Sequence, residues 1–237
     1  MSDVIRVQPE RTRHPVVAAV YTGRGLDDQI LAVAPEILGS ARVTSIIDDS
    51  IIFDINRNGC ISPAVTRRIL RYYRNAADAG ATVILNTCSS VGEIVELGRS
   101  VVEIPIVRID EPMAQAAATG FDRIGVVATL QSTLGPTKRL VAAKAEEASL
   151  PVHLVAEVAT GAYEALARRD TATHDQLVTD AVAKLSREVD VVVLAQASMA
   201  RMRDRLEEAA RVPVLTSLRS GLEAVRAALA SLGEFGG

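Results

Sequence analysis

The sequence of 237 residues contains no tryptophan, only three phenylalanines and four tyrosines, and only two cysteines. Two cysteines cannot make a disulfide framework in a chain of this length, so we predict a protein of a reducing compartment, the cytoplasm. The opening segment Met1–His14 is polar and lacks the apolar centre of a signal peptide. No apolar run approaches the length of a membrane span, so no membrane contact is expected.

An excess of positive charge is also lacking, and histidine is rare. The formal net charge is −3, and no basic patch with interleaved aromatic residues occurs, which argues against a nucleic-acid partner. The three histidines, His14, His153 and His174, have no partners at metal-ligand spacing, so we expect no metal. No P-loop and no Ser-His-Asp pattern can be assembled either.

Apolar residues, by contrast, make up 49% of the chain. They occur as short β-branched runs that alternate with helical patterns, and such runs are typical of buried parallel strands. The length suffices for one large domain or two small ones. The sequence therefore predicts an α/β protein.

The most informative stretch is Val83–Ser90, which reads Val-Ile-Leu-Asn-Thr-Cys-Ser-Ser. An apolar run ends here in small polar residues and a thiol, and the helical pattern that follows predicts a strand, a tight loop and a helix. Open α/β sheets bind ligands at the carboxyl ends of their strands, and a helix start suits a carboxylate or phosphate. We interpret Cys88 as a functional thiol, with Ser89 and Ser90 as hydroxyl donors. The alternative is a cysteine that only packs as a small hydrophobe.

The first predicted strand, Pro15–Tyr21, also ends in a polar loop. In the functional interpretation Tyr21 and Thr22 contact a substrate there. In the alternative interpretation the loop is a plain strand-to-helix turn. The polar segment Asp48–Gly59 is predicted to be an irregular loop over the site, because a loop this long in a compact domain is often functional.

A second hydroxyl-rich loop follows the predicted strand Ile124–Ala128. Thr129, Ser132 and Thr133 precede a helix that we expect to begin near Pro136, and they form a second candidate anion-binding loop. The alternative is a capped helix start, since serine and threonine cap helices in every class of protein.

The second half of the chain repeats this organisation. With an offset of 108 positions, Val83 falls on Val191 and Cys88 falls on Gln196 without gaps. Two strand-loop-helix-strand units at one spacing predict two similar lobes. We assign residues 1–112 and 218–237 to lobe one and residues 113–217 to lobe two. If the lobes face each other about a pseudo-dyad, Cys88 and Gln196 approach one ligand from opposite sides.

These segments resemble the cofactor-independent aspartate/glutamate racemase superfamily, whose relatives include hydantoin racemases, maleate isomerases and arylmalonate decarboxylases. The resemblance extends from about Pro15 to Leu232 and is carried by Cys88–Ser90, Thr129–Thr133 and Leu194–Ala200. It implies two pseudo-symmetric lobes, each a parallel sheet flanked by helices, with the active site in the cleft between them. It further implies a small carboxylate substrate and no cofactor, and it is compatible with a homo-oligomer.

Racemases of this superfamily carry a cysteine in each lobe, whereas the second position here is Gln196. An amide neither gives nor takes a proton near neutral pH, although it can hydrogen-bond an oxyanion, so the departure argues against a two-thiol racemase. The resemblance implies an isomerase/racemase-like enzyme or a decarboxylase in which Cys88 is the acid/base or the nucleophile. We expect the nearby helix start to lower the pKa of Cys88. The alternative is a non-catalytic protein that binds or senses a small carboxylate.

The predicted substrate contacts are hydroxyl and amide groups at the strand ends of both lobes. They are Tyr21, Thr22, Ser89, Ser90, Thr129, Ser132, Thr133, Gln196 and Ser198.

Overall fold

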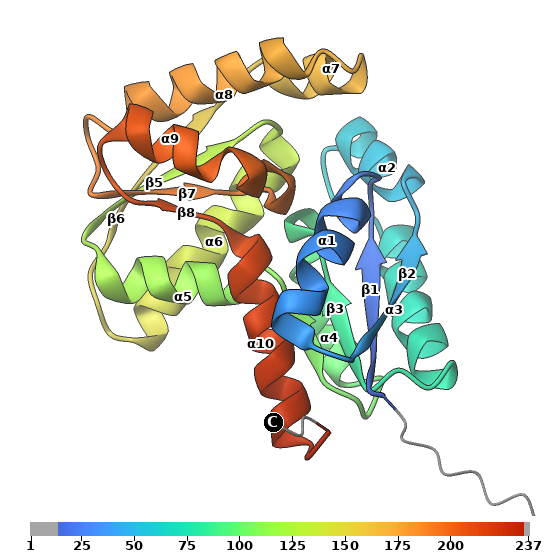
Figure 1. Cartoon of the computed structure of the whole chain (residues 1–237). Coiled ribbons are helices and arrows are strands. Elements are labelled where there is room, and N and C mark those ends of the chain that lie inside the picture. Colours follow the sequence, from blue (N-terminus) through green and yellow to red (C-terminus); the bar gives the residue numbers. More distant parts are fainter. Residues whose placement is uncertain (1–13, 235–237) are drawn as a thin grey trace, which may run out of the picture.

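The computed structural model describes residues 14–234 and contains two four-stranded parallel sheets (Figure 1). The first sheet has the strand order β2-β1-β3-β4 and the second has the order β6-β5-β7-β8. The identical order confirms the predicted α/β fold with two similar lobes. The strands are β1 (Val16–Tyr21), β2 (Arg42–Ile47), β3 (Val83–Asn86), β4 (Ile106–Arg108), β5 (Arg123–Ala128), β6 (His153–Val158), β7 (Val191–Leu194) and β8 (Val214–Leu215). None of the helices within residues 14–234 combines the length and apolarity that a membrane crossing requires.

Helices cover both faces of the first sheet. Successive residues of β1 point to opposite faces, so Val17 packs with α1 (Leu26–Leu38) and α10 (Ser217–Ser231), whereas Ala18 packs on the other face. That second face is covered by α2 (Ser50–Asn58), α3 (Pro63–Asp78) and α4 (Ile94–Arg99). The strands are buried on both sides, which explains why they read as continuous apolar runs.

The second sheet has the same layered construction. One face packs against α5 (Glu111–Gly120) and α6 (Gln131–Glu147). The other face packs mainly against α8 (Thr171–Leu185) and α9 (Arg203–Ala210), with α7 (Ala162–Ala167) at one end. Two short 3₁₀ helices, η1 (Ser89–Val91) and η2 (Ala197–Met202), follow β3 and β7.

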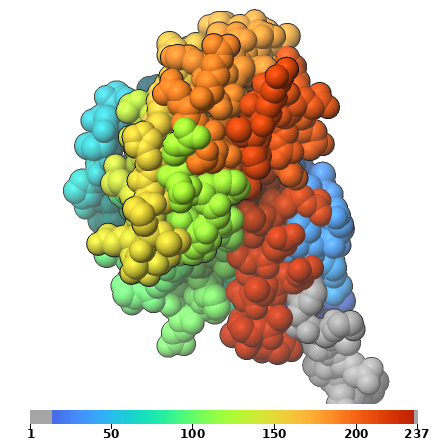
Figure 2. Space-filling model, turned by 90° about the vertical axis from the view of Figure 1, so that its left-hand side faces the viewer, coloured from blue at the N-terminus to red at the C-terminus, as the bar shows by residue number. Residues whose placement is uncertain are grey.

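The two lobes exchange a helix. Helix α5 follows the last strand of the first sheet but packs on the second sheet, where Met113 contacts the core around Ile124. Helix α10 follows the last strand of the second sheet and packs on the first, where Leu222 shares a core with Val17. In Figure 2 the red helix α10 lies at the surface between the green segment of α5 and the blue segment of α1. We therefore propose that residues 14–112 and 218–234 form lobe one and residues 113–217 form lobe two; residues 1–13 and 235–237, which the sequence assigned to lobe one, lie outside the described part of the chain.

The backbone repeats itself where the sequence offset of 108 predicts it. Strands β3 and β7 occupy equivalent positions, and a 3₁₀ helix follows each. Cys88 has φ −117° and ψ 115°, and Gln196 has φ −120° and ψ 127°. The two residues therefore stand in the same backbone conformation at the same end of their sheets.

Two predicted loops are helical in the structure. Asp48–Gly59 was predicted to be irregular but forms α2, because Ile51 and Ile55 are four residues apart and bury one face. Gly59, with φ +69°, ends this helix in the left-handed conformation that favours glycine. Helix α6 begins at Gln131 and not near Pro136, so the hydroxyls of Ser132 and Thr133 lie in its first turn.

Candidate active site

Cys88 lies two residues after the end of β3 and immediately before η1. Its side chain is half-buried and packs against the core cluster of lobe one that contains Ile51 and Val91. The hydroxyls of Thr22 and Ser90 and the N–H groups of Ser90 and Val91 lie near the thiol and favour its thiolate form. The thiol therefore stands among neutral donors that come from two strand ends of one sheet.

The prediction that the helix start lowers the pKa of Cys88 is wrong for this structure. Burial is the largest influence and raises the pKa of the thiol, while the neighbouring hydroxyl and N–H groups lower the pKa by a smaller amount. The physical reason is that η1 has only three residues and so presents few aligned peptide dipoles, whereas removal from water penalises the thiolate directly. Cys88 is therefore protonated at neutral pH.

The raised pKa of Cys88 predicts a specific pH dependence for its alkylation. In a Cys60→Ser protein, Cys88 is the only cysteine left. Because the thiolate is the reacting form, the rate of reaction with iodoacetamide should rise with pH and reach half of its plateau above the midpoint of a free cysteine, which is about 8.5. A midpoint at or below that of free cysteine, measured by intact mass against time, would contradict the burial argument.

The two lobes meet through the residues around Cys88. The hydroxyl of Ser89 donates to the backbone carbonyl of Ala195 at 3.0 Å, and the hydroxyls of Ser90 and Thr133 lie 3.2 Å apart. Ser132 donates to Asn56 of α2 at 2.7 Å. Because Ser89 follows Cys88 and Ala195 precedes Gln196, the two equivalent positions come close together across the lobe boundary.

Gln196 is held on its own side of that boundary by Thr129. Its side-chain oxygen accepts from the Thr129 N–H at 2.9 Å, and its side-chain nitrogen donates to the Thr129 hydroxyl at 2.5 Å. Both ends of the amide are thus occupied within lobe two. The position that matches Cys88 carries a fixed neutral group and no ionisable one.

The structure brings together most of the residues that the sequence singled out. Thr22 and Ser90 lie near Cys88 in lobe one, and Thr129 is hydrogen-bonded to Gln196 in lobe two. Ser198 lies in η2 and is half-buried.

Tyr21 does not join these groups. Its side chain is buried on the face of the sheet that packs against α1 and α10, whereas Cys88 packs on the opposite face. Burial raises the pKa of Tyr21 to about 12.

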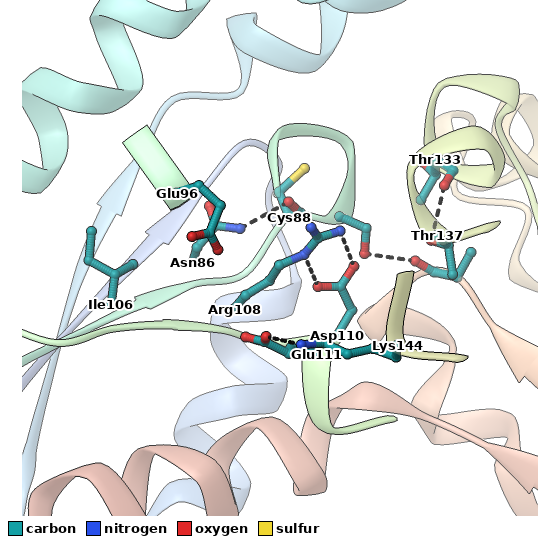
Figure 3. A network of polar contacts seen from close by, with 12 residues as sticks. Asn86, Cys88, Glu96, Ile106, Arg108, Asp110, Glu111, Thr133, Thr137 and Lys144 are labelled. Carbon is teal, nitrogen blue, oxygen red and sulfur yellow. Dashed lines mark hydrogen bonds and ion pairs between the residues drawn. The ribbon is translucent and has the colours of Figure 1, made fainter. Parts of the chain in front are cut away.

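A buried ion pair lies beneath the Cys88 turn and was not anticipated from the sequence. Arg108, at the end of β4, donates to both carboxylate oxygens of Asp110, at 2.7 and 3.1 Å (Figure 3). Asp110 is fully buried and Arg108 is 7% exposed. The guanidinium packs against Gly92, just after η1, where a Cβ atom would lie 2.6 Å from Nη2. The signal available in the sequence was a charged residue at the end of an apolar strand.

Replacing Gly92 with alanine should therefore destabilise the protein. The added Cβ must displace Arg108, which is fixed by its bidentate pair with Asp110, and overpacking of this kind costs about 1–3 kcal/mol. Chemical denaturation would measure the loss. Gly120→Ala is the matched control, because a Cβ there meets nothing within 4 Å. Equal stabilities of the two variants would contradict the packing argument.

Residues 14–234 contain no group of three or more histidine, cysteine or acidic side chains that could hold a metal ion. The groups around Cys88 are instead hydroxyls and peptide N–H groups, which suit a carboxylate or an enolate oxygen. The arrangement can therefore donate hydrogen bonds to an anion beside one thiol.

Comparison with known proteins identifies relatives of this fold. Residues 30–225 match the family model described as Asp/Glu/Hydantoin racemase. The structure is similar to the allantoin racemase from Klebsiella pneumoniae, with a TM-score of 0.65 and 18% identity over 92% of this chain and 89% of that one. It is similar to the glutamate racemase from Francisella tularensis in complex with D-glutamate, with a TM-score of 0.74 and 12% identity over 94% and 83%. It also resembles an arylmalonate decarboxylase, with a TM-score of 0.56 and 18% identity over 94% of each chain. No curated protein matches the chain in sequence.

Proposed function

Since the chain belongs to the Asp/Glu/Hydantoin racemase family, we propose that it is an enzyme that moves a proton at a carbon next to a carboxylate, with Cys88 as the acid/base. The observation that carries the proposal is the asymmetry of the two equivalent positions. One holds a thiol among hydrogen-bond donors, and the other holds the Gln196 amide tied to Thr129. A proton can then be exchanged from one face of the substrate only.

The raised pKa of Cys88 supports the role of proton donor over that of nucleophile. A nucleophilic cysteine needs to be a thiolate, whereas a protonated thiol is ready to deliver its proton. In a decarboxylation the bond to the departing carboxylate breaks, carbon dioxide leaves, and its electron pair forms an enolate. The S–H proton of Cys88 is then transferred to the enolate carbon, and the resulting thiolate takes a proton from water. In a one-sided isomerisation the thiolate form of Cys88 first takes a proton from one carbon of the substrate, and the resulting thiol returns a proton to another carbon on the same face.

The hydroxyl groups around the thiol are proposed to hold the carboxylate and the enolate oxygens. Thr22, Ser89 and Ser90 belong to lobe one, and Thr129 and Thr133 belong to lobe two. All five are less than 7% exposed. Ser89 is hydrogen-bonded to Ala195 of lobe two, and Ser90 to Thr133 of the same lobe. A substrate would take over these hydrogen bonds as it enters between the lobes.

The similar structures suggest which class of substrate to propose. The similar structures include racemases of allantoin and glutamate and a decarboxylase of arylmalonates. A single acid/base thiol favours a decarboxylase or a one-sided isomerase over a two-base racemase. A 2-substituted malonate meets these requirements, because one carboxylate can leave while the other is held.

Proton NMR in deuterated water tests the proposal. The wild-type protein is incubated with aspartate, glutamate, 2-substituted malonates, maleate and a hydantoin. The expected result is deuterium at the carbon next to a carboxylate, or a decarboxylated product, with label on one face only. Equal labelling of both faces would contradict one-sided chemistry.

A carboxylate sensor would behave differently in the same experiment. It would give saturable line broadening of one acid, with no deuterium incorporation and no product. That outcome, with Cys88→Ala giving the same broadening, would replace the enzymatic proposal by a binding function.

A further inference from the structure

A buried polar chain runs behind Cys88 from helix α3. Tyr73 of α3 is fully buried, and its hydroxyl donates to the side-chain oxygen of Asn86 at 3.0 Å. Asn86, the last residue of β3, is also fully buried, and its side-chain nitrogen donates to the backbone carbonyl of Cys88 at 3.1 Å. Figure 3 shows the Asn86 amide turned toward the Cys88 carbonyl. The chain thus links the centre of a helix to the backbone of the candidate catalytic residue.

Placing these two polar side chains in the core has a free-energy cost. A buried hydroxyl and a buried amide each carry a desolvation cost, which only their mutual hydrogen bonds offset. Apolar side chains fill the neighbouring positions, such as Ile69 on α3 and Ile84 on β3. Packing alone therefore does not require polar side chains at Tyr73 and Asn86. Their role is indicated by the group that accepts the last hydrogen bond, the backbone carbonyl of Cys88.

The hydrogen bonds from Tyr73 through Asn86 end at the backbone carbonyl of Cys88. It accepts from Asn86 and also from the N–H of Val91, at 3.3 Å. Two donors on one carbonyl set the orientation of the peptide between Cys88 and Ser89. The N–H groups of Ser90 and Val91 belong to the same turn and favour the thiolate of Cys88, so a change in the turn alters the donors near the thiol.

We propose that Tyr73 and Asn86 are positioning residues that hold the Cys88 turn so that the thiol keeps its hydrogen-bond donors. The relevance of these two residues to catalysis rests on the proposed role of Cys88. Their effect on the geometry of the turn can be tested without turnover. Burial and the nearby Cys88 raise the pKa of Tyr73, so its hydroxyl stays protonated and remains a donor. The charged groups that act on this hydroxyl are Arg99 and Arg108, and they oppose that rise.

The pH profile of Cys88 alkylation tests the inference. In a Cys60→Ser protein, Cys88 is the only thiol, and its reaction with iodoacetamide is followed by intact mass from pH 6 to pH 11. Tyr73→Phe should loosen the turn, remove donors from the thiolate and raise the alkylation midpoint by about half a unit to one unit. At a pH below both midpoints the rate then falls about three- to tenfold.

Tyr72→Phe is the matched control. It removes a hydroxyl from the adjacent residue of the same helix, but that hydroxyl donates to Asp48 and not to Asn86. Its profile should coincide with that of the Cys60→Ser parent. An equal shift in both variants would assign the effect to α3 in general and overturn the inference.

Asn86→Asp provides a second, independent variant. It keeps the shape of the side chain but replaces the donor to Cys88 by an oxygen, so the midpoint should rise at least as much as in Tyr73→Phe. Each profile is recorded below the melting temperature of its own variant, so a loss of stability does not mimic the effect. Unchanged profiles in Tyr73→Phe and Asn86→Asp would overturn the inference. Because no substrate is present, this result is independent of whether Cys88→Ala abolishes turnover.

Discussion

Replacing Cys88 with alanine is expected to lower kcat by about 10²–10⁴-fold, which is the usual contribution of a positioned acid or base. The thiol is the ionisable group among the residues that surround the proposed site in lobe one, and Gln196 offers no substitute in lobe two. The binding of the substrate should change little, because hydroxyl and N–H groups are proposed to hold its carboxylate. Steady-state kinetics, with a separate titration of the ligand, measure the two quantities.

Cys60→Ala is the control for this experiment. Cys60 is exposed and lies in the segment between α2 and α3, so its removal should leave kcat unchanged. Activity that survives in Cys88→Ala but is lost in Cys60→Ala would move the chemistry to the other thiol. Activity that survives in both would leave no role for a thiol.

Replacing Gln196 with cysteine is expected to convert one-sided chemistry into racemisation. The two positions share one backbone conformation at equivalent ends of the two sheets, so a thiol at 196 should reach the substrate from the face opposite Cys88. The product, a single enantiomer with the wild-type protein, should become a mixture that approaches equal amounts of both. Chiral chromatography of the product against time measures this change.

Gln196→Ser separates the added thiol from the lost amide. Both variants lose the two hydrogen bonds to Thr129, but serine brings no group that titrates near neutral pH. The serine variant should keep a single product enantiomer at reduced rate. Racemisation in the serine variant, or a single enantiomer in the cysteine variant, would contradict the two-sided geometry.

Much of the fold was predictable from the sequence because local and long-range signals agree. The buried strands β1, β3, β5 and β7 are short β-branched runs, and α3 begins at Pro63 after the Ser62 cap, whose hydroxyl accepts from the Val65 N–H at 3.3 Å. The repeat at an offset of 108 indicated two similar sheets. Helix α2 was missed because its polar residues outnumber its apolar ones, and only the four-residue spacing of Ile51 and Ile55 marks it.

The candidate site was predictable only in part. Small polar residues after apolar strands located Cys88, Ser90, Thr129 and Gln196, because the carboxyl ends of parallel strands share one edge. The support behind the thiol depends on contacts between distant segments, such as Tyr73 with Asn86, which no local pattern reveals. The direction of the pKa shift of Cys88 depends on how completely the turn is removed from water, and this is a property of the packed structure.

The exchange of α5 and α10 has a consequence for the order in which the chain can fold during synthesis. The core of lobe one contains Val17 and Ala19 near its beginning and Leu222, Val225 and Leu229 near its end. Although N-terminal domains generally fold first as a chain emerges from the ribosome, the sheet of β1–β4 lacks the cover of one face until α10 has emerged. In lobe two, α5 precedes the strands. All the helices that cover its sheet are therefore synthesised before α10. The second lobe of the sequence is therefore expected to be the first to complete its core.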